Sequence, residues 1–384
     1  MIDTIRLILD EGTFHINEPD RFQPNAKTIL DLKERFYGGR LMKAVLNPTK
    51  QEKQDTGYAP RLTLRRRPPN IIELVIEFSI PKLLYGNNFD EISETDFSKV
   101  IEVLQDKLEA WGILIFAELL RKAPVGSIHY GKNIVLPRYT LCKSIINLLS
   151  KAPIKQWMDH NKVDFRNGGH LYKVHTDNFE LAFYDKVKDL QQAKRGAKRA
   201  YEPEANVQGD LFDYFEVATD VQVLRMEARL NSRSQIQRML KAVGLPDDDL
   251  RFFALFSKDI AQKTLLHHWK PYKSAMALVA MSQSGTPSAM MDYLVRQDQD
   301  AAINTHLQRL GAMMLIGEVG WPGLRSLWDG MPRSFQRLKK DLESLPVGDK
   351  TRLSDIEAID ATLRAFEPVK MEQLNNANAK AVTC

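Results

Sequence analysis

A tyrosine followed closely by a lysine stands at the end of an apolar alternation in "FELAFYDK" (179–186). The alternating apolar residues before it fall on one face of a strand, so Tyr184 falls on the other face. A phenol titrates near pH ~10 and attacks a phosphate slowly unless a cation or a base lowers that cost. Lys186 can neutralise charge as it builds on a phosphate. The segment therefore predicts either a strand-end tyrosine with a solvated rim or a nucleophile with its activator beside it.

Two further strand-like segments carry polar residues with the same period. If the three strands are neighbours in one sheet, one face collects Tyr184 and all of these groups. A divalent ion, Mg²⁺ or Mn²⁺, held by a carboxylate and an imidazole could then polarise a phosphate. The alternatives are an ion-pair ladder for the Arg-Glu-Arg alternation and an ordinary polar role for the histidine. The residues are Arg225, Glu227 and Arg229 in 221–231, and His129 and Asn133 in 126–136.

The sequence pattern around these residues predicts an α+β domain over residues 1–240, whose strands and helices would position them. Alternating segments read as strands, and segments with helical spacing follow some of them. Two rounds of strand and helix indicate an antiparallel-sheet domain built from two loosely similar halves. The expected strands are 5–10, 71–80, 126–136, 221–231 and a hairpin over 169–186 that turns near Asp177-Asn178, and the expected helices are 93–112, 139–151 and 232–244.

From residue 245 to residue 384 the pattern is almost entirely helical. Thr286-Pro287 has the form of an N-cap followed by proline at the first helical position. "PRSFQRLKKDLESLP" (332–346) reads as a compact amphipathic helix. We therefore expect a domain boundary near 240–250 and a helical C-terminal domain.

The composition is that of an ordinary globular protein. The chain has 384 residues, of which 43% are hydrophobic and 27% are charged. No apolar run is long enough to span a bilayer, and the N-terminal residues do not resemble a secretory signal. Cys142 and Cys384 are the only cysteines, which excludes a cysteine-based zinc site and fits a reducing cytoplasm. We expect a cytoplasmic protein of a bacterial host with no membrane partner.

Positive charge is concentrated in two segments, although the formal net charge is only +5. "RLTLRRRPP" (61–69) lies in a region, 46–70, that reads as an exposed loop, and "KRGAKRAYEP" (194–203) also reads as a loop. Clustered lysine and arginine displace counterions from a nucleic-acid backbone. The expected DNA-binding residues are Arg65, Arg66, Arg67, Lys194, Arg195, Lys198 and Arg199.

Several segments taken together resemble the filamentous-phage gene II replication initiators and their relatives in plasmids and bacterial genomes. They occur in the expected order and cover roughly residues 1–250. The most specific are the "NNF", "FYDK" and "RMEAR" segments. The matching segments are "MIDTIRL" at the start, "IEFSIPKLLYGNNFDEI" (76–92), "IHYGKNIVL" (128–136), "FELAFYDKVKDL" (179–190) and "LRMEARLNSRSQIQRMLKAVGLP" (224–246).

The resemblance implies a metal-dependent, site-specific DNA endonuclease and strand transferase that starts rolling-circle replication. Such a protein nicks one strand of a double-stranded origin and becomes joined to the DNA through a phosphotyrosine. The expected partners are origin duplex, the displaced single strand, a host helicase and single-strand-binding protein. A second protomer is also possible.

By the same likeness Tyr184 maps to the attacking tyrosine, Lys186 to a charge-neutralising lysine and Glu227 to a metal ligand. Arg225 and Arg229 are then expected to be catalytic residues that act together with Tyr184 and Lys186. Relatives often carry Arg-Ile-Asp where this chain has Ser127, Ile128 and His129. His129 would replace the acid as a ligand, and Tyr130 is a competing nucleophile.

Two other functions remain open. A replication regulator could keep the fold and bind DNA without cutting it. A mobilisation or transposition enzyme could use the same chemistry on another substrate.

Overall fold

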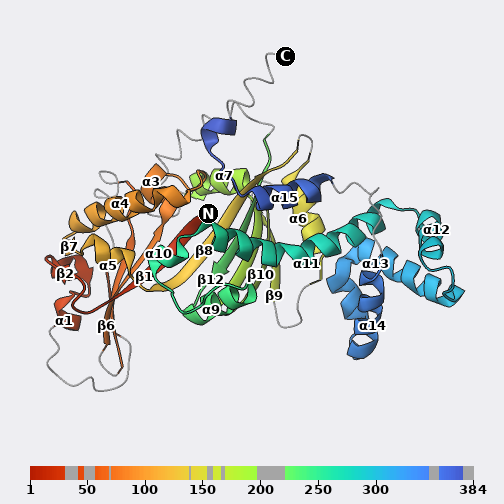
Figure 1. Ribbon diagram of the computed structural model, residues 1–384, viewed down its shortest axis with the longest axis horizontal. Coiled ribbons are helices and arrows are strands. Elements are labelled where there is room, and N and C mark those ends of the chain that lie inside the picture. The colour runs from red at the N-terminus through yellow and green to blue at the C-terminus, as the bar shows by residue number, and fades with distance from the viewer. Residues whose placement is uncertain are drawn as a thin grey trace, which may run out of the picture.

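Ten strands pair into one antiparallel sheet in the computed structural model (Figure 1). The structure describes residues 1–30, 42–46, 57–68, 71–137, 140–153, 159–165, 169–196, 221–345 and 354–374. The spatial order of the strands is β3-β4-β5-β6-β1-β8-β12-β11-β10-β9, and β2 and β7 form a separate pair. The strands are β1 (Ile2–Asp10), β2 (His15–Ile16), β3 (Phe22–Gln23), β4 (Met42–Leu46), β5 (Arg61–Arg67), β6 (Ile71–Ser79), β7 (Ile113–Leu114), β8 (Val125–Val135), β9 (Asp159–Phe165), β10 (Gly169–Thr176), β11 (Phe179–Asp185) and β12 (Val223–Leu230).

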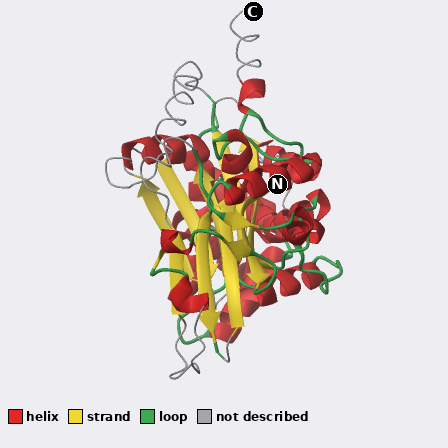
Figure 2. Ribbon diagram, turned by 90° about the vertical axis from the view of Figure 1, so that its left-hand side faces the viewer, coloured by secondary structure: helices red, strands yellow, loops and turns green. Residues whose placement is uncertain are grey.

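Helices lie mostly against one face of the sheet and above one of its ends (Figure 2). The longest, α11, crosses one face of the sheet and continues into the helical C-terminal region (Figure 1). The helices are α1 (Lys27–Leu30), α3 (Ile80–Tyr85), α4 (Phe97–Glu109), α5 (Ala117–Arg121), α6 (Cys142–Ser150), α7 (Lys186–Gly196), α9 (Arg233–Ala242), α10 (Phe252–Leu255), α11 (Lys258–Ser284), α12 (Pro287–Gln297), α13 (Ile303–Leu327), α14 (Pro332–Glu343) and α15 (Ser354–Ala365), with single 3₁₀ turns at Pro19–Arg21 and Glu94–Asp96. None of the helices in the described ranges is long and apolar enough to cross a membrane.

These elements confirm the expected α+β class with a large antiparallel sheet and a helical C-terminal region. The hairpin over 169–186 forms as β10 and β11, and it turns at Asp177-Asn178. Ser232 and Thr286 cap α9 and α12 by accepting backbone hydrogen bonds, as their positions predict. The loop expected over 46–70 is wrong for residues 61–67, because they form β5 between β4 and β6.

Alternation along the strands separates an apolar face from a polar face. The apolar face packs against α11, α6, α9 and α10, and its core includes Leu7, Ile128, Met226 and Phe183. That burial is the main driving force for the fold. A second hydrophobic cluster begins at Leu278 within α11 and includes Met313 and Trp321 from α13. The expected boundary near 240–250 stays a prediction.

Helix α13 packs closely against α11 at Gly317. A β-carbon at Gly317 would lie 2.5 Å from the carbonyl oxygen of Ser282 on α11. A β-carbon at Gly311, on the same helix, would meet nothing within 4 Å among the described atoms.

Gly317→Ala should therefore lower the free energy of unfolding by roughly 1–3 kcal/mol, because the two helices must move apart. Gly311→Ala is the matched control and should raise it by about 0.5–1 kcal/mol, because alanine is the better helix former. Urea unfolding followed by circular dichroism measures both. Equal effects of the two substitutions would contradict the close packing at Gly317.

Candidate active site

The register of three neighbouring strands brings the predicted residues onto one face of the sheet. Tyr184 on β11 pairs with Arg225 on β12, which pairs with Asn133 on β8. One rung further, Ala182, Glu227 and Gly131 align, and the next rung aligns Glu180, Arg229 and His129. The expectation that one face collects these groups is confirmed, because the alternation is unbroken through β11 and β12.

Tyr184 lies diagonally across from Glu227. Glu227 pairs with Ala182, which stands two residues before Tyr184 on β11. A diagonal pair of this kind is separated by roughly 7–8 Å between α-carbons, within reach of one phosphate. Tyr184 is 7% exposed. Burial raises its pKa well above the ordinary value, and the negative charges of Glu227 and Asp189 raise it further. The phenol therefore needs added positive charge nearby before it can ionise at neutral pH.

Glu227 lies at one end of an ion-pair ladder. Arg229 donates to Glu227 from Nε at 3.1 Å and from Nη2 at 2.6 Å, and it also forms an ion pair with Glu180. Lys173 on β10 approaches Glu180 at 2.9 Å. The ladder interpretation is thus correct for Arg229, whose role here is to hold the Glu227 carboxylate in place.

Asp3 on β1 joins the site, although sequence reasoning did not include it. Arg225 donates from Nη2 to Asp3 at 3.0 Å and from Nη1 to the Asn133 side chain at 2.9 Å. Burial acts to raise the pKa of Asp3, but the charge of Arg225 and a hydrogen bond with Glu227 lower it well below its usual range. Two carboxyl groups from β1 and β12 therefore meet at one point.

A register shift explains why Asp3 was missed. Ile2 pairs with Tyr130 and Ile5 pairs with Ile128, so the pairing slips between them. Ile2 and Ile5 are both buried in the core. Simple alternation from Ile5 places Asp3 in the core, whereas the irregularity turns it to the polar face.

A buried ion network supports Arg225 from the side away from Tyr184. Glu91 is 2% exposed and accepts from Lys132 Nζ at 2.6 Å and from the backbone of Asn133. It also lies 3.7 Å from Arg225. Burial acts to raise the pKa of Glu91, but the surrounding cations hold it low. Glu91 is therefore a fixed negative charge beneath the site.

A segment that follows α15 closes this network. The backbone nitrogen of Val369 donates to Glu91 at 3.0 Å, and Lys132 donates to the carbonyl of Glu367 at 2.7 Å. Met371 packs with Phe89, Leu190 and Val223 in a small hydrophobic cluster. The helical C-terminal region thus contributes directly to the base of the sheet site.

Lys186 places a buried ammonium group next to Tyr184. It is the first residue of α7, immediately after β11, and it is 0% exposed. Its Nζ lies 5.6 Å from the centre of the Tyr184 ring and 3.5 Å from Asp189 Oδ2, and it has no hydrogen-bond partner within the described part of the chain. Burial lowers its pKa, and the first turn of a helix also disfavours a cation. Asp185 instead caps α7, because it accepts from the backbone of Lys188 at 3.0 Å.

His129 stands at the edge of the site. Its Nε2 lies 3.2 Å from Asn231 Oδ1. In the ranges that the structure describes, no group of three histidine, cysteine or carboxylate side chains has the geometry of a complete metal centre. Asp3 and Glu227 carry oxygen donors and His129 carries a nitrogen donor, which are donor types that Mg²⁺ or Mn²⁺ can accept.

Tyr130, the competing nucleophile, is wrong as a candidate. It faces the core, it is 0% exposed, and its hydroxyl donates to the carbonyl of Leu255 at 3.0 Å. Burial raises its pKa far above the ordinary value. On β8 it lies between His129 and Gly131, which belong to the polar face, so its side chain is directed to the opposite face.

The expected DNA-binding residues divide between two environments. Arg65 and Arg67 lie on the polar face of β5, and both pair with Glu73, at 2.7 and 2.9 Å. The expectation for Arg66 is wrong, because it points to the other face, is 3% exposed and donates to the carbonyl of Ile29. Lys198 and Arg199 lie outside the described residues, as do the side chains of Lys194 and Arg195.

Comparison of the chain with protein-family models, with curated proteins and with solved structures finds no match.

Lys186→Met tests whether the buried ammonium group is as isolated as the geometry indicates. At pH 7 we expect the free energy of unfolding to rise by roughly 1–2 kcal/mol, because methionine removes an incompletely paired buried charge. The folded-state pKa is lowered, so the unfolded chain binds more protons and the wild type gains stability as pH rises towards ~10.5. The gain from the substitution should therefore shrink over that range.

Urea unfolding at pH 7 and pH 9.5 measures this difference. Lys188→Met, on the same helix but partly exposed, is the control and should change stability by less than about 0.5 kcal/mol. A Lys186→Met protein that is clearly less stable than the wild type would mean that the ammonium is well paired in solution.

Proposed function

We propose that this protein is a metal-dependent DNA-nicking and strand-transfer enzyme that initiates rolling-circle replication of a phage or plasmid. The observation that supports the chemistry is the meeting of three groups on one sheet face: the Tyr184 phenol, the Asp3–Glu227 carboxyl pair and the Lys186 ammonium. The replicative role rests on the resemblance of the segments in residues 1–250 to gene II-type initiators.

In the proposed reaction the Tyr184 oxygen attacks the phosphorus of the scissile phosphodiester. The bond from phosphorus to the 3′ oxygen breaks, and the 5′ phosphate stays joined to Tyr184. The phenol loses its proton to solvent, and the departing 3′ oxygen gains one. The bond energy is retained in the phosphotyrosine, so the strand can be resealed by the reverse attack.

Lys186 would neutralise charge on the phosphate in the transition state. Asp3 and Glu227, with His129 beside them, would hold Mg²⁺ or Mn²⁺, which supplies Lewis-acid stabilisation of the phosphate when bound. Arg225 and Arg229 act as positioning residues in this scheme, because Arg225 holds Asp3 and Arg229 holds Glu227.

A non-catalytic DNA-binding regulator is the second candidate. The raised pKa and low exposure of Tyr184 favour it, because an idle tyrosine would show the same features. A mobilisation or transposition enzyme would use the same nicking chemistry as a replication initiator and would differ from it only in its DNA substrate.

Tyr184→Phe separates the two main candidates. In Mg²⁺ or Mn²⁺ the wild type should convert supercoiled plasmids carrying DNA that neighbours its coding sequence to open circles with protein on a 5′ phosphate. Tyr184→Phe should reduce nicking by at least ~10³-fold, because the nucleophile is gone, while DNA binding stays unchanged. Tyr130→Phe is the control and should nick like the wild type. Unaltered nicking by Tyr184→Phe would remove this assignment, and binding without nicking by the wild type would favour the regulator.

Glu227→Gln tests the metal site. We expect the Mg²⁺ concentration for half-maximal nicking to rise about 10- to 100-fold, because the substitution removes a charged ligand. Glu180→Gln provides a matched control, since both carboxylates pair with Arg229. An equal rise for Glu180→Gln would show that the ladder, rather than ion binding by Glu227, sets the metal requirement.

A further inference from the structure

Helix α14 carries a compact stripe of long polar side chains on its outer face. Arg333, Gln336, Arg337 and Lys340 follow the spacing i, i+3, i+4 and i+7, so they lie on one side of the helix. All four are exposed. The opposite side buries Phe335 and Leu342 in the second hydrophobic cluster. We call these four residues the α14 stripe.

The charged side-chain groups of Arg333, Arg337 and Lys340 form no ion pair or hydrogen bond with any residue in the described ranges. The acidic residues of α14 are already engaged beside the stripe. Asp341 pairs with Arg309 of α13 at 2.7 Å, and Glu343 pairs with Lys339 at 3.6 Å. The stripe therefore presents three uncompensated positive charges to solvent.

This arrangement differs from that of an ordinary solvated helix face. Solvated faces gain stability from opposite charges at i, i+3 and i+4. Here Arg333 and Arg337 are four residues apart, and Arg337 and Lys340 are three apart, so like charges repel along the helix. A polyanion bound along the stripe would offset that repulsion.

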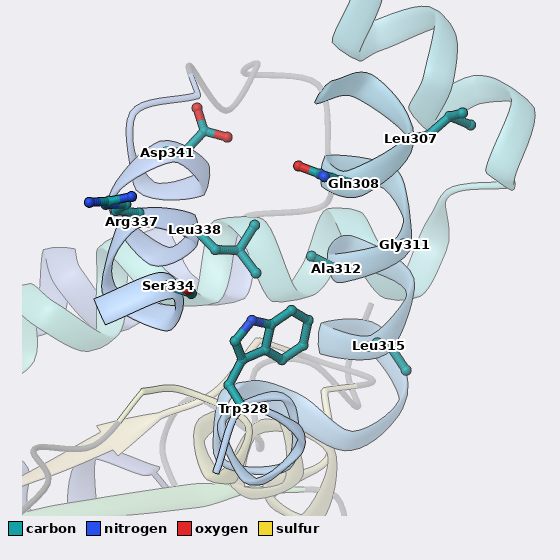
Figure 3. A pocket seen from close by; sticks show the side chains of 10 residues that line it. All are labelled: Leu307, Gln308, Gly311, Ala312, Leu315, Trp328, Ser334, Arg337, Leu338 and Asp341. Atoms are coloured by element: carbon teal, nitrogen blue, oxygen red, sulfur yellow. The ribbon is translucent and has the colours of Figure 1, made fainter. Parts of the chain in front are cut away.

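The position of α14 allows a large partner to reach the stripe. The helix lies in the C-terminal region, away from the ten-stranded sheet (Figure 1). A hollow of about 580 Å³ separates α14 from α13. Leu338 points into this hollow, and Arg337 also lines it, although its guanidinium extends away from α13 (Figure 3). Arg333, Gln336 and Lys340 are exposed and do not line the hollow, so most of the stripe is presented outward.

The dimensions and side-chain types fit duplex DNA. Seven residues of helix span about 10 Å, which corresponds to about three base pairs, and a major groove about 12 Å wide admits one helix. Arginine and lysine pair with phosphates and guanine, and glutamine pairs with adenine.

We propose that the α14 stripe binds duplex DNA in the major groove, as a second contact apart from the face that carries Tyr184. Arg333, Arg337 and Lys340 would hold phosphates or guanine, and Gln336 would contribute base selection. The biological meaning of this contact, recognition of origin duplex, rests on the proposed function. The DNA contact itself does not require nicking.

The test measures binding of the full chain to a fluorescein-labelled 24-base-pair duplex of random sequence, in EDTA, over a range of KCl concentrations. The variant is Arg333→Ala/Arg337→Ala/Lys340→Ala. The charge-matched control is Lys263→Ala/Lys270→Ala/Arg296→Ala, which removes three exposed cations from α11 and α12. Because each phosphate contact contributes about 0.9 to the slope of log affinity against log salt, the stripe variant should lose up to about three units of slope and bind at least about tenfold more weakly. The control should stay close to the wild type.

A stripe variant that binds duplex with wild-type affinity and slope would overturn the proposal. Equal losses for the duplex and for a 24-nucleotide single strand would also overturn it, because the stripe would then be a general polyanion patch. Because EDTA prevents metal-dependent nicking, this result is independent of the proposed active site. A stripe variant that nicks a single-stranded substrate normally but has lost duplex binding would leave the nuclease standing and support two separate contacts.

Discussion

The charged face of the sheet depends on the path of Arg225 across β8. A β-carbon at Gly131 would lie 2.5 Å from the Arg225 guanidinium, so a glycine is needed where that side chain passes. Through this gap Arg225 reaches from β12 to Asp3 on β1, two strands away in the sheet. The arginine thereby fixes the carboxylate that lies beside Glu227. The missing side chain of Gly131 and the reach of one arginine together join strands that do not pair directly.

Burial of so many charges in one place would oppose folding if the charges were isolated. Here most of them are paired. Glu91 balances Lys132, Arg225 balances Asp3, and Arg229 binds both Glu227 and Glu180. Lys186 is the exception, with a single partner at 3.5 Å. Removal of one member of a buried pair leaves its partner uncompensated, so the face behaves as a unit. An incompletely paired cation beside a tyrosine is the feature that a purely structural network does not explain.

The sequence predicted those parts of the fold and site that follow from local periodicity. Tyr184 and Glu227 could be placed on one face because alternation is unbroken in β11 and β12. Asp3 could not, because a register shift in β1 reverses its side. Arg66 was misplaced because a basic run was treated as a loop, whereas a strand sends neighbouring arginines to opposite faces. Glu91 lies in an irregular segment between α3 and α4, and its partners are 41 and 278 residues away. Contacts between residues so far apart in the sequence cannot be predicted from the local pattern of apolar and polar residues.

The span of these pairings also affects how the protein is made. Arg225 and Asp3 are 222 residues apart, Lys132 and Glu367 are 235 apart, and Val369 and Glu91 are 278 apart. Contacts of such high sequence separation form slowly, because the entropy of closing long loops opposes them. A partly folded chain would therefore contain its tyrosine but lack the organised carboxylates. The charged face beside Tyr184 would thus be completed only late in folding, when segments from both ends of the described chain have come together.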